Sequence, residues 1–226
     1  KPVKFASLDE VISVFEKYKG FEYGLISATI TDYPYLEGLL DYLENQNIPF
    51  SVSSMRADKI DKRLLMLLKN TDHHSFTIAP EGISQRMRDI MLKDLTTEQI
   101  IKTLELGREV GFKHVKFYYI IGLEEEDEGD YAEFFDFLKT VVDMGYQEVV
   151  ISVNPLVPKP FTPFAGRKMI EKREYEEKTK FIRRNLPKKV KADFESYKLS
   201  RIQYELSHLK GSQTVAYLGQ IIKTEK

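Results

Sequence analysis

The sequence contains no cysteine among its 226 residues. This absence excludes disulfides, thiolate metal ligands and cysteine nucleophiles from the chain itself, but not from flanking sequence. A strong net charge is also missing: 34 basic and 35 acidic residues give a formal net charge of -1. Such a balance creates no global field that would attract nucleic acid or a membrane surface. Any partner of that kind would need a local patch.

Long apolar runs are missing as well. No run approaches the ~20 residues of a membrane span, and Lys1–Ser7 lacks a signal-peptide layout. We therefore expect a cytoplasmic protein with no membrane partner. The chain opens with Lys1 instead of Met, which predicts that it is part of a longer protein. A hydrophobic content of 42% supports a substantial core.

Short β-branched segments alternate with amphipathic ones along the first three quarters of the chain. Strands are predicted at 23–31, 49–54, 75–79, 113–121 and 148–153. Helices are predicted at 7–19, 35–46, 61–69, 84–92, 97–110 and 130–144. This alternation favours parallel βαβ units with right-handed crossovers. The sequence thus predicts an α/β barrel-like body at 1–166 and a mostly helical C-terminal extension at 167–226, with a short strand at 188–194.

A proline-rich loop follows the predicted strand 148–153. Four of the nine prolines lie between Asn154 and Phe164. Each proline fixes φ and removes a backbone donor, so neither a helix nor a strand ladder continues through this loop. The loop is either a stiff connector or part of a ligand site, because ligands of parallel α/β folds bind at the carboxyl ends of strands.

Polar side chains gather where several predicted strands end. The ends read Ser27–Asp32, Ser53–Asp58, Ala79–Gly82, Ile120–Leu123 and Asn154–Pro155. Hydroxyls, an arginine and a carboxylate at one rim suit a ligand that carries both a carboxylate and hydroxyl groups. Lys116 and Tyr118 share one face of strand 113–121 by the period of two. Since parallel strands are usually apolar on both faces, this polar face predicts a lumen that holds a ligand.

Four segments together resemble the radical S-adenosylmethionine (radical SAM) superfamily. They are Ser53–Asp58, Ile78–Gly82 followed by Arg86 and Lys93, Lys116–Leu123, and Asn154–Phe164. The subgroup that the chain most resembles is often fused to a cobalamin-binding domain. The resemblance implies a partial six-stranded (β/α)6 TIM-like barrel, S-adenosylmethionine as cofactor, and a [4Fe–4S] cluster held by a CxxxCxxC loop after the first strand. Because the chain has no cysteine, the resemblance also implies that the first strand and cluster loop precede Lys1, leaving five barrel strands and a chain that is inactive alone.

The resemblance also implies roles for individual residues. The backbone of Thr29, Ile30 and Thr31 would receive the cofactor's amino group, and Glu81 would contact its ribose. Lys93 would pair with the cofactor's carboxylate, with Arg56 and Ser54 as further candidates. The adenine would lie against the backbone of Ile121, Gly122 and Leu156. Lys116 and Tyr118 would face an unknown substrate, and cobalamin would be bound only by a longer protein.

Simpler interpretations stay open at this point. In one interpretation, Arg56 and Asp58 form an ion pair on the surface. In another, Glu81 only stabilises the N-terminus of the helix at 84–92. The acidic run 124–130 favours a helix start over a metal site. The basic stretch 167–191 is more typical of a solvated helix than of an RNA contact, because four glutamates interrupt it. Two alternative functions are considered. The first is a βα-barrel enzyme that binds a phosphorylated metabolite, which is disfavoured because no glycine-rich loop opens a helix. The second is a non-catalytic scaffold or RNA-binding module.

Overall fold

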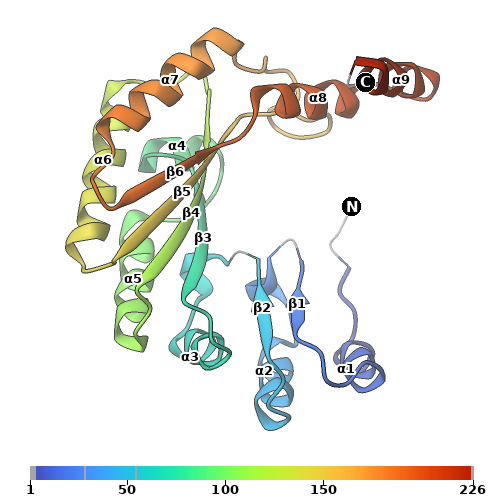
Figure 1. Ribbon diagram of the computed structural model, residues 1–226, viewed down its shortest axis with the longest axis vertical. Helices are drawn as coiled ribbons and strands as arrows, with labels where there is room; N and C mark the ends of the chain where they lie inside the picture. Colours follow the sequence, from blue (N-terminus) through green and yellow to red (C-terminus); the bar gives the residue numbers. More distant parts are fainter. Residues whose placement is uncertain (1–3, 28, 54, 225–226) are drawn as a thin grey trace.

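The computed structural model describes residues 4–27, 29–53 and 55–224. Within these residues the strands all run parallel and fall into two sheets (Figure 1). The smaller sheet pairs β1 (Tyr23–Leu25) with β2 (Phe50–Val52). The larger has the order β3 (Ser75–Glu81), β4 (His114–Ile121), β5 (Glu148–Pro155) and β6 (Val190–Phe194). A single bridge between Met55 and Ile78 connects the two sheets.

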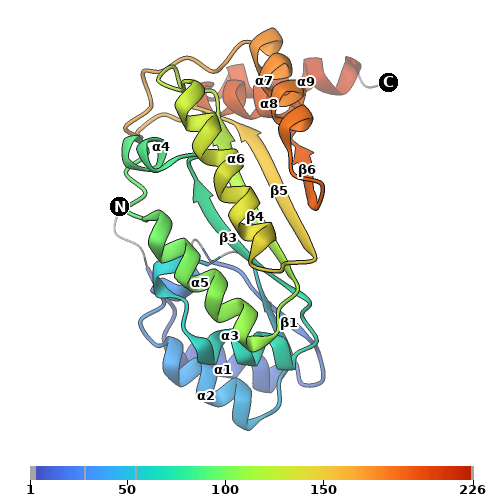
Figure 2. The same cartoon turned by 90° about the vertical axis from the view of Figure 1, so that its left-hand side faces the viewer.

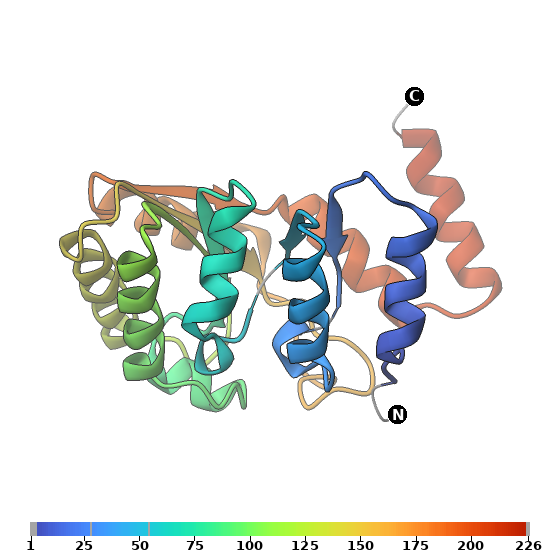
Figure 3. The same cartoon turned by 90° about the horizontal axis from the view of Figure 1, so that it is seen from below.

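Helices follow most strands, as expected of βα units. The first group comprises α1 (Leu8–Lys17), α2 (Leu36–Asn45), α3 (Lys62–Asn70), α4 (Gln85–Ile90), α5 (Thr97–Val110) and α6 (Glu128–Asp143). The second comprises α7 (Lys172–Asn185), α8 (Tyr197–His208) and α9 (Ser212–Thr224), and short 3-10 turns occur at Ile30–Asp32 and Ala57–Lys59. Seen from below, α6, α5, α3, α2 and α1 form a row along one side of the strands (Figure 3).

The predicted helix ends are confirmed where a capping pattern marked them. Ser7 and Glu10 form a capping box at the start of α1, and Thr96 and Gln99 form one at the start of α5. Gly111 ends α5 in the left-handed conformation, at φ 95°. One helix begins earlier than predicted, because the side chain of Asp127 caps α6 two residues after the turn at Glu125.

The two faces of the larger sheet differ sharply. Every second residue of β4 and β5 is buried under the helices, starting from Val115 and Val149. Figure 2 shows α5 and α6 lying across this side. Phe117 and Tyr119 pack there against Phe137 and Phe134 of α6. The opposite face is only half-buried; we call it the open face.

Several predicted strands differ from the structure. The ladder was expected to end before Asn154, but β5 continues through Asn154 and Pro155, which pair with Ile120 and Ile121, because the fixed φ of proline is compatible with extended backbone. Likewise, β3 continues through Pro80 to Glu81. The strand predicted at 23–31 is only three residues long, and the segment after Ile26 turns into the 3-10 helix at Ile30–Asp32. The short strand predicted at 188–194 within the extension is β6, and its parallel pairing with β5 makes it a sixth strand where five were expected. Among the described residues, no helix is both long and apolar enough to cross a membrane.

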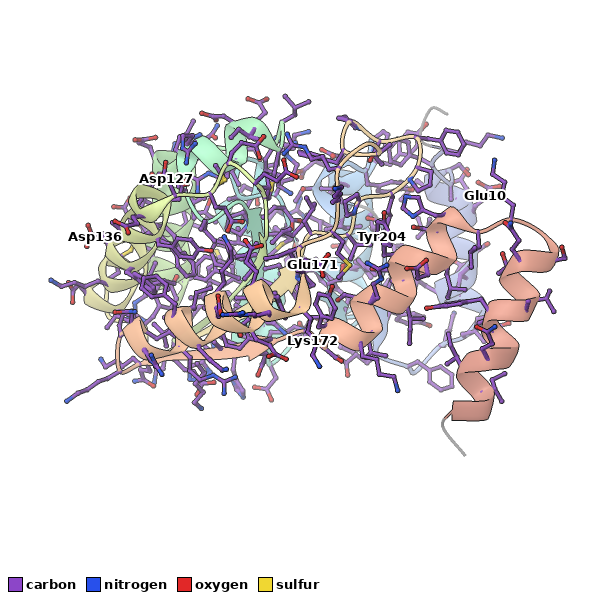
Figure 4. All side chains as sticks on the ribbon, turned by 90° about the horizontal axis from the view of Figure 1, so that it is seen from above. Glu10, Asp127, Asp136, Glu171, Lys172 and Tyr204 are labelled. Carbon is purple, nitrogen blue, oxygen red and sulfur yellow. The ribbon has the colours of Figure 1, made fainter. Side chains whose placement is uncertain are left out.

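The C-terminal helices lie on the side to which the strands' carboxyl ends point. In the view from above, α7, α8 and α9 cross the foreground, with Glu171 at the start of α7 and Tyr204 on α8 (Figure 4). Tyr175 of α7 ties this region to the sheet by donating hydrogen bonds to the carbonyls of Val153 and Glu195. The side chain of α9 residue Val215 is 72% exposed, so this helix packs little on the body.

Candidate active site at the carboxyl ends of the strands

Glu81 ends β3 in an unusual backbone conformation. Its φ is +66°, in the left-handed region that side chains other than Asn, Asp and Gly rarely adopt. The register between β3 and β4 shifts at the same point, between Ile78 and Glu81. Gly82 follows because a Cβ there would lie 2.5 Å from the backbone nitrogen of Arg88. The local chain is therefore held in a strained turn that aims Glu81 at the rim, a pattern found at functional sites.

Glu81 pairs with Lys93, the two residues for which the resemblance implied cofactor contacts. Lys93 Nζ lies 3.6 Å from Glu81 Oε1, and the side chains are 24% and 30% exposed. Burial raises the pKa of the Glu81 carboxyl, while the charge and hydrogen bond of Lys93 act to lower it. The structure therefore brings these two predicted residues together as one charged pair beside the carboxyl end of β3.

Arg56 donates hydrogen bonds to one carboxylate and to one backbone carbonyl. Its Nε and Nη2 donate to the two carboxylate oxygens of Asp58 at 3.0 and 2.8 Å, and Nη2 also donates to the carbonyl of Asp94. Burial acts to raise the pKa of Asp58, but the Arg56 hydrogen bond and charge outweigh it and leave the pKa lowered. A bidentate pair of this kind fixes the turn after β2. Ser54 lies outside the described residues.

The segment after β1 divides between two cavities. Thr29 and Ile30 line a groove of about 700 Å³ between α1 and β1. Thr31 lines a separate cavity of about 230 Å³ with residues of α2 and α3. Among the described residues, Thr31 Oγ1 is a buried side-chain oxygen that has no hydrogen-bond partner. Such an orphaned oxygen is costly unless a ligand or water satisfies it, which suits a polar ligand near this turn.

The ends of β4 and β5 are joined to each other. The Leu156 N–H donates to the Ile121 carbonyl at 2.8 Å, and the Gly122 N–H donates to Glu126. Gly122 has a φ of +97°, and a Cβ there would lie 2.9 Å from Ile170. These predicted adenine-contacting residues therefore adjoin one another. The Gly122 N–H already donates to Glu126 and is therefore not available to a ligand.

Glu126 is a site residue that the sequence did not single out. Its side chain is fully buried and accepts hydrogen bonds from the backbone of Gly122 and Leu123, from Tyr131 and from Lys178 of α7. Burial, followed by the neighbouring Glu126 charge, raises the pKa of the Tyr131 hydroxyl. The acidic run 124–130 contained this residue, but its partner Lys178 lies 52 positions away and left no local signal.

Lys116 and Tyr118 lie on the open face, as the period of two predicted. Tyr118 is in register with Ser152, and Ile120 with Asn154, on the neighbouring strand β5. The ammonium of Lys116 lies 5.0 Å from the centre of the Tyr118 ring. Their neighbours along β4, which are Val115, Phe117 and Tyr119, are buried under the helices. The side chains of Lys116 and Tyr118 therefore point to the open face.

A [4Fe–4S] cluster does not fit the residues of this chain. Iron–sulfur clusters need thiolate ligands, and the sequence has no cysteine. Within the described part of the chain, no group of three histidines or acidic residues is arranged to hold a metal ion either. S-adenosylmethionine fits better, because the rim presents a carboxylate–ammonium pair that could meet the charged groups of the cofactor.

Parallel strands connected by helices, with polar residues at the carboxyl ends of the strands, define an α/β protein. Residues 1–138 match the family described as the Radical SAM superfamily. Because this match covers more than half of the 226 residues, the chain belongs to the radical SAM superfamily, and the resemblance inferred from the sequence is confirmed at that level.

Two further proteins are similar to this chain. An uncharacterised protein of Methanocaldococcus jannaschii is 31% identical in a 205-residue alignment that covers 87% of this chain and 44% of that protein. The chain therefore spans less than half the length of this curated relative. Coproporphyrinogen III oxidase of Escherichia coli, a radical SAM enzyme, is 18% identical, with a TM-score of 0.46 over 66% of this chain and 36% of that one.

Proposed function

We propose that the chain is the S-adenosylmethionine-binding core of a radical SAM enzyme whose cluster-binding segment lies outside these 226 residues. Membership of the superfamily implies S-adenosylmethionine and a [4Fe–4S] cluster in general, and a chain without cysteine cannot hold that cluster itself. When bound, the cluster would supply the electron that cleaves S-adenosylmethionine to a 5′-deoxyadenosyl radical. The chain's own residues would bind and orient the cofactor and substrate.

The observation that carries this proposal is the free edge of β1. Within the described residues β1 pairs only with β2, and its other edge faces the groove along α1. Apolar side chains line or border this groove, and Ile26 is 88% exposed beside it. A bare strand edge next to an apolar groove favours the addition of another strand. An added parallel strand here would bring its carboxyl end, and a cluster loop following it, to the same rim as Glu81.

In this proposal, Lys93 pairs with the cofactor's carboxylate and Glu81 contacts its ribose. Because the two now pair with each other, the bound cofactor would compete with Glu81 for Lys93. Thr29, Ile30 and Thr31 would contact the amino group. Arg56 and Ser54 would support the same end, and Ile121, Gly122 and Leu156 would lie against the adenine. Lys116 and Tyr118 would face the substrate.

A nucleic-acid function has less support. Three of the six basic side chains of α7 pair with glutamates: Lys172 with Glu176, Arg173 with Glu177, and Lys178 with Glu126. Paired charges of this kind attract phosphate weakly. A cobalamin domain and the cytoplasmic location remain proposals for the longer protein.

Binding experiments test the proposal. In the longer protein carrying a reconstituted cluster, Lys93→Ala and Glu81→Ala should each weaken S-adenosylmethionine binding roughly tenfold to a hundredfold, the effect of losing a charged contact. Lys102→Ala, an exposed lysine of α5, is the matched control and should bind normally. Unchanged affinity in both rim variants would remove this pair from the cofactor site. A loss for Lys93 alone would leave Glu81 with a structural role at the turn.

A further inference from the structure

The open face of the larger sheet carries polar side chains whose hydrogen-bonding groups are unused. Thr77 of β3, Tyr118 of β4, and Ser152 and Asn154 of β5 lie on it by register and burial pattern. Across the described residues, none of these four side chains makes a hydrogen bond. The buried Asp130, by contrast, accepts hydrogen bonds from Ser84 and Arg86. Unused donors and acceptors concentrated on one sheet face indicate a surface that contacts a polar ligand.

Lys116 gives this surface its charge. It lies on an inner strand, in register with Thr77 on one side and Val150 on the other, so neither neighbour can neutralise it. Its ammonium contacts the Tyr118 ring and, within the described part of the chain, forms no ion pair. A lysine is unfavourable in the middle of a parallel sheet, where apolar β-branched residues are usual. Its position is explained if an anion completes the site.

The nearby carboxylates do not fill this role. Glu148, at the start of β5, is 2.6 Å from Lys191 of β6 and is occupied by it. Asp193 is exposed and is in register with Ser152 of β5. It lies on β6, which is two strands away from β4, the strand that carries Lys116. Standard strand spacing and rise place its Cα about 12 Å from that of Lys116. Lys116 is thus left as an uncompensated cation at the centre of the open face.

The dimensions of this surface suit a small molecule. From the level of Lys116 to the level of Asn154 is four residues along the strands, or about 13 Å. The width from β3 to β6 is three strand spacings, or about 14 Å. A metabolite with one anionic group at Lys116 and hydroxyl or carbonyl groups reaching Tyr118, Ser152 and Asn154 would extend from there toward the rim where Glu81 lies.

We propose that the open face binds a small polar metabolite through an anionic group, a carboxylate or a phosphate, held by Lys116 beside the ring of Tyr118. This inference rests on the proposed function, in which the open face receives the substrate, and adds the chemical class of that substrate. Lys116 is its specificity-determining residue. Tyr118, Ser152 and Asn154 supply the hydrogen bonds that orient the neutral part of the molecule.

Two matched pairs of probes test the charge requirement on the 226-residue chain. Glucose 6-phosphate is compared with glucose, and succinate with succinamide, each titrated by calorimetry and by ligand-observed NMR. At least one anion should bind saturably, and its neutral partner should bind at least tenfold more weakly, because a hydrogen bond to a charged group contributes about that factor. Binding by glucose 6-phosphate alone assigns a phosphate, and binding by succinate alone assigns a carboxylate. Binding by neither anion, or equally by neutral and charged partners, overturns the proposal.

Variants locate the site. Lys116→Gln should weaken anion binding about tenfold or more, while Lys116→Arg, which keeps the charge, should retain most of it. Lys102→Gln on the helix-covered side is the control and should bind as the unaltered chain does. Circular dichroism and melting curves establish that each variant is folded. Equal anion affinity in Lys116→Gln and the unaltered chain would place the anion elsewhere and refute the assignment.

The result separates cleanly from the test of the proposed function. Anion binding by the open face needs no cluster, and S-adenosylmethionine binding at the rim needs no anion at Lys116. If the longer protein binds no cofactor but this chain binds anions through Lys116, the radical SAM function fails and the anion site remains. If the longer protein binds the cofactor but this chain binds no anion through Lys116, the radical SAM function is retained and only the proposed substrate class is refuted.

Discussion

The strained turn at Glu81 makes a prediction that two substitutions can separate. Its φ of +66° costs a residue with a Cβ on the order of 1–2 kcal/mol, whereas glycine adopts the conformation freely. Glu81→Ala keeps that cost and loses the pair with Lys93, a partly exposed pair that contributes about 0.2–1 kcal/mol. Glu81→Gly loses the same pair but relieves the strain, offset by about 0.4–1 kcal/mol of extra chain entropy in the unfolded state.

Glu81→Gly should therefore be more stable than Glu81→Ala by about 1 kcal/mol, and close to the unaltered chain. For a chain of this size such a difference shifts Tm by roughly 2–4 °C. Scanning calorimetry and urea unfolding measure it. The matched control is Glu105 in the exposed face of α5, where helical backbone reverses the order and glycine should be less stable than alanine by about 1 kcal/mol.

The refuting result is a glycine variant at position 81 that is no more stable than the alanine variant. That order would show that the turn stores no backbone strain. The inference that the chain maintains an unfavourable conformation in order to present a carboxylate at the rim would then be wrong. Both variants should lose cofactor affinity in the longer protein, since neither has the carboxylate.

Three further predictions concern the same rim. Glu126→Ala should destabilise the chain by about 3–5 kcal/mol, because it removes the buried acceptor of two backbone N–H groups and of Tyr131 and the nearer of two carboxylates that pair with Lys178. The exposed Glu124→Ala should change little, and similar urea midpoints for the two variants would contradict this. Gly82→Ala should cost about 1–3 kcal/mol, since its Cβ would meet the backbone of α4, and an unshifted Tm would show that the turn can move. Because the pKa of Glu81 is raised, the stability of the unaltered chain relative to Glu81→Gln should be greatest below pH 4.5 and should fall as the pH rises through the folded pKa. A relative stability that increases with pH would contradict the raised pKa.

Local sequence signals predicted much of the fold. Hydrophobic periodicity and capping residues located the helices, and Ser7 with Glu10 and Thr96 with Gln99 form the expected capping boxes. The period of two correctly separated Lys116 and Tyr118 from their buried neighbours on β4. These features depend on residues within one or two turns of each other, which is why the sequence alone could predict them.

The features that were missed depend on long-range contacts. The strand at 23–31 was predicted too long, because it takes its length from pairing, and β1 finds only the three-residue β2. Nothing near Glu126 signals that Lys178 will reach it from α7. The pairing of Glu81 with Lys93 follows from a left-handed turn that no residue pattern for glutamate predicts.

In the proposed function the site is divided between two stretches of chain, and this division has a physical origin. The residues here provide a rim with polar groups and an open face that carries Lys116, while a cluster requires thiolates that the sequence lacks. The free edge of β1 marks the place where the described sheet can be extended. An added strand would pair with β1, cover the exposed Ile26, and place its loop near the carboxyl ends of the other strands.

The most direct measurement is the formation of 5′-deoxyadenosine from S-adenosylmethionine under a strong reductant. It compares this 226-residue chain with the proposed longer protein, each treated with iron and sulfide. We predict that this chain forms no cluster and no product, whereas the longer protein forms both and contains a three-cysteine loop ahead of Lys1. A longer protein without such a loop, or one that holds a cluster but yields no 5′-deoxyadenosine, would contradict the assignment of this chain as a radical SAM core.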